Sequence, residues 1–434
     1  MQGRWKNLIQ RYPTLAKVST LMTGTVLAQV LVFALAPISS RVYTPEQTGE
    51  FALILAVATT IATVAGLRYD LAIVLEKDPA NARLLRNTVS WIITIVSVLS
   101  TVVLWIIGDW LARTINHPQL APWFATAGLI VFTTAQVNSY NYWFTKTDQF
   151  GAISVNRVQM RGSIEIIQIL LSLFWIGGLA GLVVGYVVGQ AGAAGTLAFK
   201  GMKKVPGETE PTVSRKSLLK RHRRMPLING PNALIDQIRL QGINLLIGAL
   251  YSTNAVGQFS KAWLLMQAPV TLVTGAVSQV FFQRFADTPR GEVQALVKKS
   301  VKASAAVGFF PFLIMLLLAP IIFPWYLGSQ WTPSGFIAQA LVPWLFLNVT
   351  TSPISTVFIV TQRQHELFMF AVVYMATGLG SIYLGYHAGW TILQTTWLLS
   401  GLMALCLIGM IFLTIRAGRI YDASAPVDDG EPEA

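Results

Sequence analysis

Long apolar stretches of about twenty residues follow one another along almost the whole chain, and they constrain its fold more than any other feature. A helical stretch of this length spans the hydrocarbon core of a bilayer. Only helices or closed barrels satisfy backbone polar groups in lipid, so we interpret these stretches as helices. Charged residues make up 12% of the 434 residues, roughly half the fraction usual in soluble domains. The sequence therefore excludes a water-soluble protein and predicts an all-α integral membrane protein.

Twelve of these stretches are predicted to be transmembrane helices. They cover residues 18–40, 51–75, 88–108, 121–144, 151–175, 179–199, 226–250, 259–285, 301–327, 336–360, 367–386 and 391–415. A basic connection between the sixth and seventh spans divides the chain evenly. We therefore expect two parallel six-helix lobes around a central cavity. The predicted organisation is an N-terminal lobe at 1–199, a basic cytoplasmic loop at 200–224, a C-terminal lobe at 225–421 and an acidic disordered tail at 422–434.

The basic residues predict the orientation of the chain. Of the 32 Lys and Arg residues, 27 fall on one side of this topology, and only Arg41 and Arg113 fall in loops on the other. Because cytoplasmic loops carry the excess of Lys and Arg, both termini are predicted to be cytoplasmic. The first span is too long for a signal-peptide core and is expected to remain uncleaved. The outer loops are short and nearly uncharged, which argues against an enzyme.

Residues that commonly bind metals or nucleotides do not form recognisable motifs. Cys406 is the only cysteine, and the four histidines are far apart in the sequence. The chain has no HExxH, CxxC or GxxxxGK[ST] motif. We therefore expect no metal, no cofactor, no catalytic residue and no nucleic-acid partner.

A short motif recurs in the two halves of the chain. Each copy lies in the connection between the first and second spans of its half, and the two copies are separated by 208 positions. Tyr43, Thr44, Gly49, Glu50 and Phe51 correspond to Tyr251, Ser252, Gly257, Gln258 and Phe259. Since six spans separate the copies, both have the same orientation, as expected for a parallel repeat about an axis along the membrane normal.

Residues 43–51 (YTPEQTGEF) and 66–72 (GLRYDLA), together with the twelve spans and the repeat, resemble the oligosaccharide flippases. This family includes O-antigen and polysaccharide repeat-unit flippases and belongs to the multidrug/oligosaccharidyl-lipid/polysaccharide exporter superfamily. The resemblance implies export of a polyprenyl-pyrophosphate-linked oligosaccharide to the outer leaflet of a bacterial inner membrane by alternating access, for the synthesis of surface polysaccharides such as lipopolysaccharide. It also implies a hydrated cavity lined by cationic residues, with membrane lipids and other polysaccharide-assembly membrane proteins as partners.

Ionisable residues within the predicted spans are the main candidates for this cavity. Each costs roughly 2.5 to 3.5 kcal/mol at membrane depth and should face protein or water. Guanidinium groups bind phosphate oxygens through paired hydrogen bonds, and lysine adds a point charge. The candidate substrate-binding cations are Arg68, Arg157, Arg161, Arg239 and Lys261, and the candidate ion-coupling acids are Asp70, Glu165 and Asp236. Snorkelling arginines and local ion pairs remain alternative interpretations.

Sugar hydroxyl groups require amide and aromatic partners instead. The candidates are Asn138, Asn141 and Tyr142 in the fourth span and Asn232 in the seventh. Aromatic residues at the inner end of a span also form interfacial belts, which is the alternative explanation for the fourth span.

Two other functions are compatible with parts of this pattern. A drug or cation export antiporter on the same fold would normally have a more acidic cavity, whereas cations outnumber acids among the intramembrane candidates. A membrane polysaccharide polymerase or ligase would be expected to have a long outer loop with catalytic acids or arginines. The short outer loops make this second alternative the weaker one.

Overall fold

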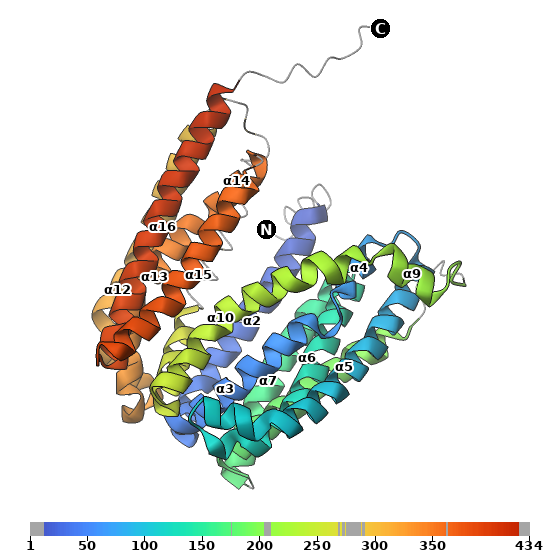
Figure 1. Cartoon of the computed structure of the whole chain (residues 1–434), viewed down its shortest axis with the longest axis horizontal. Coiled ribbons are helices and arrows are strands. Elements are labelled where there is room, and N and C mark those ends of the chain that lie inside the picture. Colours follow the sequence, from blue (N-terminus) through green and yellow to red (C-terminus); the bar gives the residue numbers. More distant parts are fainter. Residues whose placement is uncertain are drawn as a thin grey trace, which may run out of the picture. The chain divides into compact units, whose positions relative to one another are not determined.

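The computed structural model describes residues 13–174, 176–203, 210–267, 270, 274, 288, 291–361 and 363–424. Within these residues the ordered elements are all helices (Figure 1). The chain divides into two compact units, one comprising Met1–Ser260 with Tyr326–Trp331 and the other comprising Lys261–Trp325 with Thr332–Ala434. The all-α prediction is confirmed. Most of the predicted span 259–285, part of the 200–224 loop and residues 425–434 of the predicted tail lie outside the described residues.

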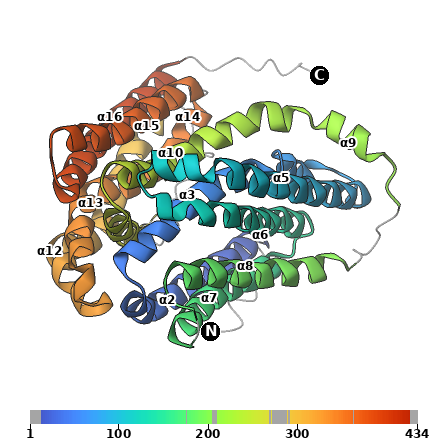
Figure 2. The same ribbon diagram turned by 60° about the horizontal axis from the view of Figure 1, so that its bottom comes forward.

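The first unit is a group of packed long helices. They are α2 (Pro13–Val42), α3 (Pro45–Ala65), α5 (Pro79–Thr114), α6 (Ala121–Lys146), α7 (Phe150–Phe174), α8 (Gly178–Gly201) and α10 (Gly230–Leu250), with the short helices α4 (Tyr69–Leu75) and α9 (Arg215–Arg221). α6 packs against α3, α5 and α8, and α7 packs against α2 and α8 (Figure 2). Gly185 and Gly189 allow the close approach of α8 to α7, since a Cβ at either position would lie within 3 Å of α7 backbone atoms. Their four-residue spacing is the small-residue pattern of tightly packed membrane helices.

The predicted second span is not one continuous helix. α3 ends at Ala65, and α4 begins at Tyr69 after a sharp break. Leu67 and Arg68 adopt the left-handed conformation, with φ values of 49° and 58°. Non-glycine residues rarely occupy this region, so the packing around the break must compensate for its strain. The break corrects the prediction of a single helix over residues 51–75.

The two copies of the repeated motif contact each other within the first unit. Each begins a helix with a hydroxyl cap: Thr44 accepts from the backbone N–H of Gln47, and Ser252 accepts from that of Ala255. A Cβ at Gly49 would lie 1.8 Å from the carbonyl oxygen of Thr253, and a Cβ at Gly257 would lie 1.8 Å from that of Pro45. This reciprocity is the pattern of a two-fold contact, in which equivalent residues exchange roles. We call it the glycine crossing.

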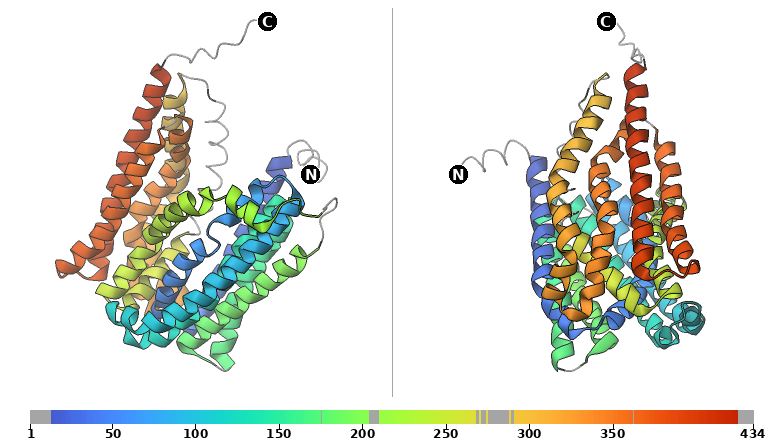
Figure 3. Two further views of the ribbon diagram at one scale, coloured as in Figure 1. Left: turned by 45° about the vertical axis from the view of Figure 1, so that its right-hand side comes forward. Right: turned by 90° about the vertical axis from the view of Figure 1, so that its left-hand side faces the viewer.

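The second unit contains α12 (Val293–Leu327), α13 (Thr332–Thr351), α14 (Val357–Val360), α15 (Gln364–His387) and α16 (Ile392–Ala423), except that the last two residues of α12 belong to the first unit (Figure 3). α16 packs against α13 and α15. Near its end, the Asp422 carboxylate accepts hydrogen bonds from the backbone N–H groups of Gly291, Val293 and Gln294, at 2.9, 3.2 and 2.9 Å. Asp422 therefore caps the first turn of α12 and is part of the folded helix rather than of a disordered tail.

Replacing Asp422 with alanine should destabilise the start of α12. Removal of a helix-capping side chain costs about 0.5 to 2 kcal/mol, and here three backbone donors lose one acceptor group. We expect a thermal midpoint several degrees lower in detergent, measured by the fluorescence of the purified protein. Asp422→Asn keeps one acceptor oxygen and should show a smaller decrease. Equal midpoints for wild type and Asp422→Ala would contradict this role.

Nine helices in the described residues are long and apolar enough to cross a membrane. α7 and α10 do not meet this criterion, and both carry several polar and charged side chains. With 25 and 21 residues they are nevertheless of spanning length, because a helix rises about 1.5 Å per residue. The total of twelve spans in two six-helix lobes remains a prediction. The first unit extends to Ser260 and so includes α10, which the sequence analysis placed in the second lobe.

Candidate functional site: a charged cavity in the first unit

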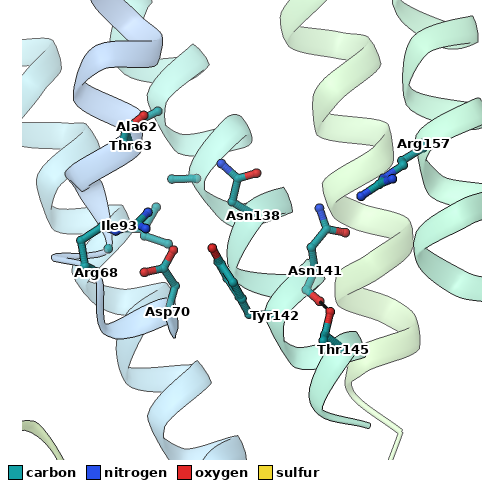
Figure 4. A pocket seen from close by; sticks show the side chains of 12 residues that line it. Ala62, Thr63, Arg68, Asp70, Ile93, Asn138, Asn141, Tyr142, Thr145 and Arg157 are labelled. Atoms are coloured by element: carbon teal, nitrogen blue, oxygen red, sulfur yellow. Dashed lines mark hydrogen bonds between the residues drawn. The ribbon is translucent and has the colours of Figure 1, made fainter. Parts of the chain in front are cut away.

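A cavity of about 360 Å³ lies among α3, α4, α5, α6 and α7 of the first unit (Figure 4). Its volume is within the range of small-molecule sites, about 300 to 1,000 Å³. Six of the residues predicted from the sequence to contact substrate or a coupling ion are among the twelve that line it. The lining consists of Ala62, Thr63, Gly66, Arg68, Asp70, Ile93, Ala135, Asn138, Asn141, Tyr142, Thr145 and Arg157.

The break between α3 and α4 places two charged side chains on the same wall of the cavity. Arg68 is the N-cap residue of α4, and Asp70 is in its first turn. In a continuous helix, side chains two positions apart would point in different directions. The left-handed turn at Leu67 and Arg68 removes this restriction, and both side chains line the cavity. Figure 4 shows the two side chains close together, across the pocket from Asn138 and Tyr142 of α6.

α6 supplies the opposite, uncharged polar wall. Asn138, Asn141, Tyr142 and Thr145 are spaced by three, one and three residues, so they occupy one face of the helix. Tyr142 lies close enough to Arg68 and Asp70 to interact electrostatically with both. This face offers amide, phenol and hydroxyl groups beside the charged wall, which suits a ligand that carries both phosphate and hydroxyl groups.

Arg157 brings a second positive charge from α7. Its Nη1 donates a hydrogen bond of 2.7 Å to the hydroxyl oxygen of Thr25 on α2. This bond fixes one end of the guanidinium group, which carries further N–H donors that a ligand could use. With Arg68 and Asp70 ionised, the lining carries two positive charges and one negative charge. The cavity therefore favours an anionic ligand.

Several polar atoms in the lining have no partner among the residues that the structure describes. Arg68 Nε, Asp70 Oδ1 and Asn141 Oδ1 are buried and make no hydrogen bond there. Buried polar groups without partners are uncommon and costly in proteins. Their gathering around one cavity indicates a site where water or a polar ligand completes the hydrogen bonding.

The remaining predicted residues do not line this cavity. Arg161 is exposed on α7, and Glu165 is half-buried one turn further along the same helix. On α10, Arg239 Nη2 is 3.4 Å from Asp236 Oδ1, and Asn232 is exposed. Lys261 is half-buried at the first residue of the second unit. The structure thus brings together the candidates of the second and fourth predicted spans with Arg157 of the fifth, and it leaves Arg161, Glu165 and the candidates of the seventh and eighth spans outside.

The sequence analysis missed three threonines at or near the site. Thr63 and Thr145 line the cavity, and Thr25 anchors Arg157. Thr145 follows Asn141 by four positions, so its place on the same helical face was detectable from spacing. Thr63 and Thr25 carry no such signal, because threonines are common in membrane helices and both hydroxyls donate to carbonyl oxygens of their own helix.

Comparison with known families identifies the family of the chain that forms this cavity. A family model described as polysaccharide biosynthesis protein matches residues 38–335, which is more than half of the chain and includes every residue that lines the cavity. The chain belongs to the polysaccharide biosynthesis protein family. This family match confirms the resemblance to oligosaccharide flippases that residues 43–51 and 66–72 indicated. No curated protein matches this family member in sequence.

Solved structures show the fold of this polysaccharide biosynthesis protein. An inward-facing multidrug resistance MATE family transporter of the MOP superfamily matches with a TM-score of 0.73 and 15% identity, covering 93% of this chain and 96% of the other. The lipid II flippase MurJ, in an inward closed conformation, matches with a TM-score of 0.72 and 13% identity, covering 93% and 89%. A MOP superfamily transporter from Pyrococcus furiosus matches with a TM-score of 0.53 and 16% identity, covering 94% of each chain. The chain is therefore a multi-pass membrane protein with the fold of MOP superfamily transporters.

Proposed function

We propose that this protein is a flippase that moves a polyprenyl-pyrophosphate-linked oligosaccharide from the cytoplasmic to the outer leaflet of a bacterial inner membrane by alternating access, with both termini in the cytoplasm. The observation that carries the proposal is the cavity in which Arg68 and Arg157 face the amide and hydroxyl groups of α6. The arginines suit the pyrophosphate, and the α6 face suits the neighbouring sugar. The family and the similarity to a lipid II flippase support this substrate class.

In this mechanism the lipid tail remains in the bilayer while the headgroup enters the cavity. Arg68 and Arg157 compensate the phosphate charges, which would otherwise be costly to remove from water. An inside-negative membrane potential favours outward movement of an anion by about 2.3 kcal/mol per charge per 100 mV. Asp70 lies beside the proposed phosphate position and must stay protonated, hydrated or ion-bound when the phosphate is present. We therefore propose it as the residue that couples transport to a cation.

A drug or cation antiporter is the second candidate, and Asp70 is the observation that favours it. Its buried Oδ1 makes no hydrogen bond within the described part of the chain, so it could accept a cationic ligand directly. The structural match to a multidrug resistance transporter is compatible with this activity. Two arginines in the same lining make the cavity a poor site for a large cation.

The deciding experiment measures flipping of a fluorescent polyprenyl-pyrophosphate oligosaccharide in proteoliposomes. We expect wild type to flip this lipid and Arg157→Gln to flip it more slowly by at least about tenfold, since hydrogen bonds to charged groups contribute about 1.5 to 3 kcal/mol. Arg161→Gln on the same helix should have a smaller effect, and Arg113→Gln, at an exposed ion pair with Asp109, should have none. If wild type flips no lipid but exchanges a small cation for protons, the antiporter assignment replaces the flippase.

A further inference from the structure

The loop that joins α8 to α10 is held by a buried carboxylate at the end of α4. Arg221 Nη1 lies 3.1 and 3.2 Å from the two carboxylate oxygens of Glu76 and donates to them. His222 Nε2 lies 3.1 Å from Glu76 Oε2. The Glu76 side chain is only 6% exposed. A buried charge of this kind is stable only while its partners remain in place, so Glu76 ties the loop firmly to the first unit.

Further contacts extend this attachment along the loop. The Tyr69 hydroxyl donates to the carbonyl oxygen of Leu219 at 3.3 Å. Asn81 exchanges two hydrogen bonds with Thr212, one of 2.9 Å from its amide to the threonine hydroxyl and one of 3.1 Å from the backbone N–H of Thr212. Leu218 is 1% exposed. We call residues 210–222 the strap; α9, its helical part, packs against α5 (Figure 1).

The strap contacts both ends of α4, the helix that carries Arg68 and Asp70 into the cavity wall. Tyr69 is the first residue of α4, and Glu76 is its C-cap. α4 has seven residues, too few to be stable or fixed in position without tertiary contacts. Arg68 and Asp70 stand at the opposite end of α4 from Glu76, after a strained break from α3. Together with the packing of α4 against α5 and α6, the strap therefore helps to set where these two side chains point.

We propose that Glu76 is a positioning residue: by holding the strap against α4, it keeps Arg68 and Asp70 directed into the cavity. Its effect on transport rests on the proposed flippase function. The strap continues through η2 (Met225–Asn229), which also packs against α4, into α10. Because the strap is continuous with α10, a movement of α10 displaces Arg221 and His222, which bind Glu76. The orientation of Arg68 and Asp70 therefore depends on the position of α10.

The first test reads the cavity without relying on transport. In a Cys406→Ala background, Thr145→Cys places a thiol in the cavity wall, and its reaction with a membrane-impermeant maleimide reports access to the cavity. Glu76→Gln should change the labelling rate severalfold, because α4 is no longer held. Asp109→Asn, which breaks an exposed pair with Arg113 in the same unit, is the matched control and should leave the rate unchanged.

The second test asks whether Glu76 supports transport by holding the strap against α4. In Cys406→Ala protein with native Thr145, Glu76→Gln should reduce flipping of the polyprenyl-pyrophosphate oligosaccharide severalfold. Asn81→Cys with Thr212→Cys, joined by oxidation or by a short thiol crosslinker, reattaches the strap by another route. Crosslinking should restore flipping in the Glu76→Gln background, and cleavage of the crosslink should abolish the gain.

The two tests distinguish a failure of the positioning role of Glu76 from a failure of the proposed flippase function. If Glu76→Gln protein is not monodisperse, Arg221→Met interrupts the same interaction from the strap and replaces it in both assays. Unchanged labelling in a folded variant, or lost flipping that the crosslink does not restore, would overturn the positioning role. If wild type flips no lipid, the proposed function fails, while the labelling result still decides whether Glu76 positions α4.

Discussion

Replacing Arg68 with asparagine is expected to slow flipping of the lipid-linked oligosaccharide by at least about tenfold without lowering thermal stability. A hydrogen bond to a charged group contributes about 1.5 to 3 kcal/mol, and each 1.4 kcal/mol changes an affinity tenfold. Arg68 has a φ of 58°, in the left-handed region that asparagine adopts several times more readily than most residues. The variant therefore loses the charge while keeping the backbone turn.

Both quantities can be measured on one preparation, as initial flipping rates in proteoliposomes and as the thermal midpoint in detergent. Arg113→Asn, at the exposed end of α5, is the control for loss of an arginine. The double variant Arg68→Asn, Asp70→Asn separates two roles. When flipping is measured without an ion gradient and compared with Asp70→Asn alone, the double variant should remain slower if Arg68 contacts the pyrophosphate, and it should match Asp70→Asn if Arg68 only neutralises Asp70. A steep loss of stability in Arg68→Asn would show that the arginine supports the fold instead.

Replacing Gly257 with alanine is expected to destabilise the protein strongly, although the change adds only one methyl group. The new Cβ would lie 1.8 Å from the carbonyl oxygen of Pro45, and only backbone movement can relieve that overlap. Overpacking of a well-packed interior typically costs about 1 to 3 kcal/mol, and more where the neighbour is rigid. The thermal midpoint and the yield of monodisperse protein should both fall.

The reciprocal geometry supplies a matched comparison for Gly257. Gly49→Ala should have a similar effect, because its Cβ would meet the carbonyl oxygen of Thr253 at the same distance of 1.8 Å. The double variant should be less destabilised than the sum of the two, since the first methyl group already separates the helices that the second would separate. Gly192→Ala on α8 has open space and should be neutral or stabilising. A tolerated Gly257→Ala would contradict the tight crossing.

Hydropathy predicted most of the helices because the hydrocarbon thickness of a bilayer fixes their length and their apolar content. It could not predict the break after Ala65, since Gly66 is an ordinary residue of membrane helices and the left-handed turn is made by Leu67 and Arg68. Their conformation is determined by packing against α5 and α6, which sequence periodicity does not describe. For the same reason the docking of the strap, through Glu76 and residues far away in sequence, was not foreseen.

The sequence could predict site residues that share one face of a helix. It could not distinguish similar residues whose roles differ only through their tertiary contacts. Asn138, Asn141 and Tyr142 share one face of α6, and that face lines the cavity. Arg157 and Arg161 are separated by one turn of α7 and looked equivalent in the sequence. Only Arg157 lines the cavity, with its guanidinium bound to Thr25. No local pattern distinguishes the two, because the difference arises from the position of α2.

At the glycine crossing, the joining of both copies in one chain permits an asymmetric contact. When two identical chains meet at a two-fold contact, a residue on the axis faces the same residue of the other copy. Glu46 and Asn254 are equivalent positions, and in this chain the Asn254 amide donates to the Glu46 carboxylate. A dimer of identical chains would place glutamate against glutamate, or asparagine against asparagine, at this position. A single chain that carries both copies can place glutamate against asparagine, which is an asymmetric bond that two identical chains could not form.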